Sequence, residues 1–144
     1  MNTRAAPLKG SLVVARLLAA LTMVCWLAGT SRASDQDPVQ PDTVWKGEIY
    51  QGNNSFAATV YVHQRESDRI KGELDFETTG GVNRLAFQGN IVGGDVVVWI
   101  TDKIAGNVTY PGLYIGKIDG DRISGTWQVP SAGQYDQFSL SLVQ

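Results

Sequence analysis

From Thr43 to the end of the chain, apolar and polar residues alternate with a period of two, which is typical of strands that bury one face. Runs rich in Val, Ile, Tyr, Phe and Trp are separated by Gly, Asn and Asp at the spacing expected of an all-β domain. This pattern predicts about eight strands and no helix longer than a turn. The predicted strands are residues 44–51, 56–64, 69–77, 83–92, 96–101, 112–118, 122–129 and 135–143.

The connections between these strands are short. Segments 93–95 (Gly-Gly-Asp) and 119–121 (Asp-Gly-Asp) suit tight hairpins, because Gly, Asn and Asp tolerate the positive φ of such turns. Short connections make neighbours in sequence neighbours in the sheet. We therefore expect a single antiparallel up-and-down barrel of about eight strands over residues 43–144, with an open barrel or a β-sandwich as alternatives.

A glycine signature recurs along the predicted strands. The pattern apolar–polar–Gly–polar–apolar is centred on Gly47, Gly72, Gly89 and Gly125, with a looser copy at Gly116. Residues two apart share a strand face, so each glycine lies among large apolar side chains on the inner face. Glycine in a strand often marks a bend or a close backbone approach, and curled sheets need such kinks. The signature therefore predicts a sheet bent around its own core.

The inner face collects almost no polar groups. Binding a polar ligand needs a few placed donors and acceptors, so this interior suits an apolar ligand or none. A solid core is the alternative, because side chains just fill an eight-stranded barrel. The residues predicted to face inward are Trp45, Ile49, Phe56, Val60, Val62, Ile70, Leu74, Phe76, Leu85, Phe87, Ile91, Val96, Val98, Ile100, Trp127, Phe138, Leu140 and Leu142.

Five aromatic residues are candidates for contact with a ligand or partner. Trp45 and Trp127 are predicted to line the interior, and Tyr110 and Tyr114 share the inward parity of the nearby glycines. The two tyrosines either place their hydroxyls at a barrel mouth, or cover the core with their rings while their hydroxyls contact water. Trp99 lies in a strand that is apolar on both faces. An exposed apolar patch there indicates a protein partner, and packing against a neighbouring segment is the alternative.

Catalytic chemistry has little support in the sequence. The single histidine, His63, is predicted to face solvent, and nucleophile-elbow, phosphate-loop and metal-ligand spacings are absent from the chain. Glu73 and Asp75 fall on the predicted outer face. Asp119 and Asp121 together offer fewer oxygens than the six or more that calcium prefers, and suit a hairpin turn better. We expect a non-enzymatic protein without a cofactor or metal.

The N-terminal segment has the pattern of an export signal. The charged residues among the first thirty are all basic, and they precede an uncharged, mostly apolar run over residues 17–29. This run is shorter than the roughly 20 residues of a membrane span. Ser31 and Ala33 suit a cleavage site that places the cut before Ser34. A retained anchor is the alternative, because residues 11–14 extend the apolar run.

Residues 1–33 are therefore predicted as a signal peptide and 34–42 as a flexible leader, and the protein as exported to a periplasmic or extracellular location. Cleavage removes Cys25, the single cysteine, and four of the 12 basic residues, which against 14 acids leaves a net charge of −6. An acidic surface argues against nucleic acid as a partner, because nucleic acids bind to positively charged protein surfaces. We expect no membrane span after cleavage.

The glycine-bent strands, with Ser124-Gly125-Thr126-Trp127 near the end, resemble the calycin-like barrels, which include lipocalins and avidin-type proteins. The resemblance covers residues 43–144 and implies a small β-barrel architecture. Trp45 precedes Gly47, the reverse of the lipocalin Gly-x-Trp order, so the resemblance transfers no ligand and no site residue. The apolar interior and the volume that inward glycines leave unfilled favour a non-catalytic binder of a small apolar ligand. A structural or protein-interaction domain with a solid core is the alternative.

Overall fold

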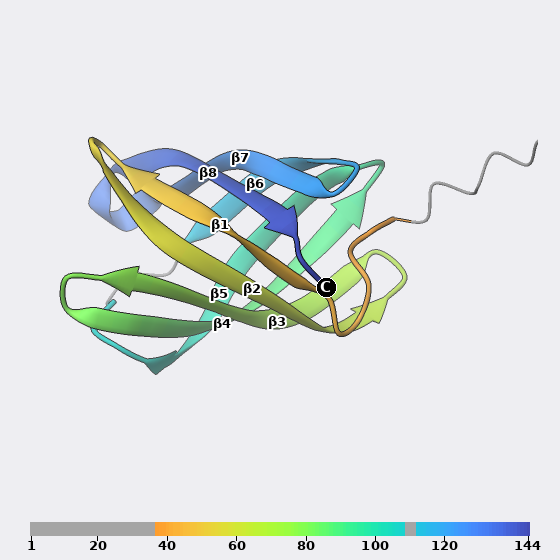
Figure 1. The fold of residues 1–144 in the computed structure, drawn as a ribbon, viewed down its shortest axis with the longest axis horizontal. Coiled ribbons are helices and arrows are strands. Elements are labelled where there is room, and N and C mark those ends of the chain that lie inside the picture. The colour runs from red at the N-terminus through yellow and green to blue at the C-terminus, as the bar shows by residue number, and fades with distance from the viewer. Residues whose placement is uncertain (1–36, 109–111) are drawn as a thin grey trace, which may run out of the picture. The chain divides into compact units, whose positions relative to one another are not determined.

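The computed structural model describes residues 37–108 and 112–144. The predicted signal peptide, the first three residues of the predicted leader and Tyr110 lie outside these described residues. The eight strands form a closed antiparallel barrel in up-and-down order, which confirms the predicted fold class (Figure 1). The strands are β1 Val44–Gln51, β2 Asn54–Glu66, β3 Arg69–Thr78, β4 Gly81–Val92, β5 Asp95–Ala105, β6 Leu113–Asp119, β7 Arg122–Val129 and β8 Gln134–Leu142, with a short 3₁₀ helix, Pro130–Ala132, between the last two.

Closure of the barrel depends on the pairing of the first strand with the last. Trp45 pairs with Leu142 and Ile49 with Phe138, so β1 lies between β2 and β8 (Figure 1). β5 and β6 complete the ring through five residue pairs, from Asp95–Lys117 to Trp99–Leu113. The open-barrel and sandwich alternatives are therefore excluded. Among the described residues, no helix has the length and apolar character needed to cross a membrane.

The recurring glycines allow neighbouring strands to approach closely. A Cβ atom at Gly89 would lie 2.6 Å from the carbonyl oxygen of Val97, and one at Gly116 would lie 2.9 Å from the Phe138 ring. Both separations are shorter than ordinary van der Waals contact. The expectation that the inward glycines leave volume unfilled is thus wrong, because the backbone of the adjacent strand fills the space beside Gly89 and the Phe138 ring of β8 fills that beside Gly116.

Residues 37–43 cover one end of the barrel, next to Trp45. Val39 is only 1 % exposed, and its carbonyl oxygen accepts a hydrogen bond of 2.7 Å from the Arg65 guanidinium. A second guanidinium nitrogen of Arg65 lies 2.8 Å from Oδ2 of Asp37. The amide of Asp42 donates to the carbonyl of Val62. Part of the segment predicted as a leader therefore belongs to the hydrophobic core and covers this end.

Candidate functional site

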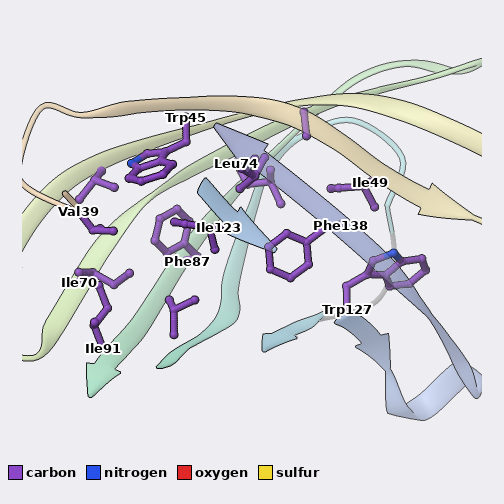
Figure 2. Close-up of a cluster of buried hydrophobic side chains, with 14 of the residues drawn as sticks. Val39, Trp45, Ile49, Ile70, Leu74, Phe87, Ile91, Ile123, Trp127 and Phe138 are labelled. Atoms are coloured by element: carbon purple, nitrogen blue, oxygen red, sulfur yellow. The ribbon is translucent and has the colours of Figure 1, made fainter. Parts of the chain in front are cut away.

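The centre of the barrel is almost filled by side chains. A cavity of about 60 Å³ remains there, with walls that are apolar apart from Tyr114. Ligand pockets are typically 300 Å³ or larger, so this cavity alone is too small for an organic ligand. Figure 2 shows the cluster of buried hydrophobic side chains at the centre of the barrel, with Val39 and Trp45 at one end of the cluster and Trp127 at the other.

A larger pocket of about 240 Å³ lies at the end of the barrel opposite Val39, and we call it the mouth pocket. Its walls are mainly aromatic and aliphatic, and three polar side chains are contributed by the strand ends. Ile49 and Tyr114 line both the mouth pocket and the central cavity, so the two spaces adjoin. The lining residues are Ile49, Gln51, Phe56, Phe76, Thr78, Leu85, Ile100, Val108, Gly112, Tyr114, Trp127, Val129 and Gln134.

Tyr114 places a polar group between the two spaces. Its ring contacts Phe138 edge-to-face, with centroids 5.7 Å apart and an interplanar angle of 72°. Its Cζ atom, which carries the hydroxyl, lies near Gly112, where an added Cβ would be 3.8 Å away. Burial raises the pKa of Tyr114 above that of a free tyrosine, because the anion would lose its hydration. Within residues 37–108 and 112–144, no fully buried side-chain nitrogen or oxygen lacks a hydrogen-bond partner.

The two predicted tryptophans lie at opposite ends of the barrel. Trp127 lines the mouth pocket, where its Nε1 donates a 2.7 Å hydrogen bond to the carbonyl oxygen of Tyr50. Trp45 is fully buried at the covered end, and its Nε1 donates to Oγ1 of Thr43 at 3.2 Å. The structure therefore brings Trp127 and Tyr114 into one site and leaves Trp45 in the wall of the central cavity. Both indole orientations are fixed by hydrogen bonds.

Asn83 holds one wall of the mouth pocket in place. It is 3 % exposed, and its Oδ1 accepts hydrogen bonds from the amides of Asn107 (2.8 Å) and Val108 (3.2 Å). Its Nδ2 donates to Oγ1 of Thr78 at 3.3 Å. Asn83 thus anchors the segment after β5, which carries Val108 into the pocket wall. The sequence signal for this role was an asparagine on the inward parity of β4.

Four titratable residues on the outer face of β2, β3 and β4 lie close to one another: His63, Glu73, Asp75 and Arg84. Arg84 forms two 2.7 Å hydrogen bonds to the carboxylate of Asp75, as expected for a bidentate pair. His63 lies at a β-bulge and is half exposed, with its Nε2 atom 3.8 Å from Oε1 of Glu73. These positions agree with the predicted solvent-facing locations of His63, Glu73 and Asp75. Within the described part of the chain, no three metal-ligating side chains gather into a site.

Trp99 lies on the outer face, with 38 % of its surface exposed. It pairs with Leu113 of β6 on one side and with Gln88 of β4 on the other. Trp99 therefore lies between an apolar stretch of β6, which includes Ile115, and a polar stretch of β4, which includes Gln88. It takes no part in the mouth pocket.

The fold and the mouth pocket define a class: a small closed up-and-down β-barrel, covered at one end and hollowed at the other. No protein-family model matches the chain, and no curated protein is similar to it in sequence. The function is therefore argued from the site itself.

Proposed function

We propose that this protein is a non-catalytic binder of a small, mostly apolar ligand, and that its barrel is of the calycin-like type. The ligand occupies the mouth pocket rather than the centre of the barrel, which is packed almost solid. The volume of about 240 Å³ lies just below the usual range for ligand pockets, so the ligand is smaller than a drug-sized molecule.

The chemistry of the lining defines the ligand further. Phe56, Phe76 and Trp127 offer aromatic surface for an apolar body. Gln51 and Gln134 supply polar groups among the walls, and Tyr114 supplies a hydroxyl deeper inside. For a ligand of about a dozen non-hydrogen atoms, a dissociation constant in the micromolar range needs about −0.7 kcal/mol per atom, which lies between the usual values for drug-sized and for very small ligands.

The observation that carries this proposal is the Tyr114 hydroxyl. A phenol in an apolar setting is a well-placed hydrogen-bond donor, and an acceptor group on a bound ligand could receive its hydrogen bond. The hydroxyl adjoins space in which such a group fits, because Tyr114 lines both the central cavity and the mouth pocket. The preferred ligand therefore has an apolar body and a hydrogen-bond acceptor that reaches Tyr114.

Fluorescence titration with 1-aminoanthracene, a small apolar dye, tests the proposal. We expect saturable binding, and the indole NMR signal of Trp127 should shift more than that of Trp45. Ile100→Trp adds volume at the mouth pocket and should weaken dye binding at least about tenfold, a change of about 1.4 kcal/mol.

A matched control places the same change away from the mouth pocket. Ile118 is also a partly buried strand isoleucine packed against the core, and it does not line the mouth pocket. Ile118→Trp should therefore leave dye affinity unchanged, provided that thermal melts show both variants folded. Absence of dye binding, or equal loss in the two variants, would contradict the proposed site.

We further propose that residues 1–33 are removed during export. The support is the sequence pattern of the N-terminal segment, with a basic region, an apolar run and small residues before Ser34. Intact-mass measurement of the protein from its native source should give the mass of residues 34–144. A full-length mass would refute cleavage, and any co-purified molecule seen under native conditions would identify the ligand.

A further inference from the structure

A second hollow, of about 340 Å³, lies on the outer face of the barrel over β2 to β5. It is separate from the mouth pocket, with which it shares no lining residue. Its walls are mainly polar, apart from the exposed indole of Trp99. We call this hollow the outer groove.

The strand register places the side chains of the outer groove in rows. Trp99 pairs with Gln88, Gln88 with Lys71, and Lys71 with Gln64, so these four residues form one line across β5, β4, β3 and β2. All four are exposed. Because paired residues in a sheet project from the same face, an aromatic ring, two amides and an ammonium group are presented side by side.

A second row runs parallel to the first, two residues further along each strand. Asn90 pairs with Arg69, and Arg69 with Glu66, and all three are exposed. Among the described residues, the amides of Gln88 and Asn90 make no side-chain hydrogen bond, and Arg69 forms no ion pair. The donors and acceptors of the outer groove are therefore available to a ligand.

We propose that the outer groove is a carbohydrate-binding site. A pyranose ring has a face of C–H groups that stacks on an indole, and hydroxyls at its edge that both donate and accept hydrogen bonds. Trp99 supplies the stacking surface. Gln88 and Asn90 supply amides that can donate and accept at once, as hydroxyl groups require. Lys71 and Arg69 add donors to ring or hydroxyl oxygens.

A saccharide fits this arrangement better than a protein surface does. The hollow lies on the polar side of Trp99, whereas the apolar neighbours Leu113 and Ile115 belong to the opposite side, on β6. Ile115 is 42 % exposed, about as much as Trp99. A protein partner recognised by hydrophobic contact would use both sides of Trp99, whereas a saccharide in the outer groove would use only the polar side.

The test is an NMR titration of the full chain with cellotetraose, maltotetraose, chitotetraose and tetragalacturonate. At least one probe should shift the indole signal of Trp99 at millimolar concentration and leave that of Trp127 unmoved. Trp99→Ala and Gln88→Ala should each weaken binding at least about tenfold, whereas Trp99→Tyr, which keeps an aromatic face, should largely retain it.

Ile115→Ala is the matched control, because it removes an equally exposed apolar side chain on the other side of Trp99. It should bind the saccharide as the unmodified protein does. The proposal is overturned if none of the four probes shifts the Trp99 signal, or if Trp99→Ala binds normally. It is also overturned if Ile115→Ala loses as much affinity as Trp99→Ala, the pattern expected of an apolar face that recognises a protein. Each result is independent of dye binding at the mouth pocket.

Discussion

Replacing Gly72 with alanine tests whether the recurring glycines hold the barrel together. A Cβ at this position would lie 2.7 Å from Cζ of Phe87 and would also run into the carbonyl oxygen of Tyr61. The ring must therefore withdraw by nearly 1 Å to reach ordinary contact distance, and the strand carrying Tyr61 must shift as well. Overpacking of this kind costs about 1–3 kcal/mol of unfolding free energy.

Urea unfolding followed by tryptophan fluorescence measures this cost, because Trp45 and Trp127 are buried at the two ends of the barrel. In a thermal melt, the midpoint temperature of the Gly72→Ala variant should be roughly 5–20 °C lower for a domain of this size. Gly80→Ala is the matched control. A Cβ there would meet its nearest atoms at 3.7 and 3.8 Å, so stability should be unchanged or slightly raised. Equal stability of the two variants would refute the close-approach explanation of the glycine signature.

Three further predictions concern the two ends of the barrel. Val39→Ala should lower the unfolding free energy by about 2 kcal/mol, whereas Val92→Ala, at a side chain 64 % exposed, should change it by less than about 0.5 kcal/mol in the same urea assay. Asn83→Ala should cost about 1–2 kcal/mol and speed amide hydrogen exchange at residues 107 and 108, because both amides lose their acceptor. Above about pH 10 the unfolded chain loses the Tyr114 proton while the folded barrel retains it, so stability falls as the pH rises. Tyr114→Phe should show a smaller decline between about pH 9 and 11, and an identical decline would contradict the burial of this phenol.

The strands and their order follow from local features of the sequence. Alternation with a period of two marked the strands, and residues 44–51 and 122–129 have the bounds that the pattern predicts. Prediction fell short at the ends of β5, which continues to Ala105, four residues past the predicted end at residue 101. This extension is paired with β4 through two register shifts. The length of β5 depends on its pairing with β4, so the residue pattern within β5 alone could not predict where the strand ends.

The candidate site was less accessible to sequence reasoning. Parity placed Tyr114 and Trp127 on the inner face, but could not show that they meet at one end while Trp45 lies at the other. That outcome depends on the stagger of the strands around the barrel. The rim residues Gln51 and Gln134 were missed because they lie at strand ends, where alternation carries no information about what they face.

Local sequence features are sufficient to predict that this chain forms alternating strands, turns back at Gly- and Asp-rich segments and bends inward at repeated glycines. These are local properties, governed by backbone sterics and by residues two apart. The location of the remaining space, in contrast, depends on how the whole barrel packs. Neighbouring backbone fills the volume beside Gly89, Val39 covers one end from outside the strands, and the remaining volume collects beside Tyr114. Packing of this kind joins residues distant in sequence, and no local pattern encodes it.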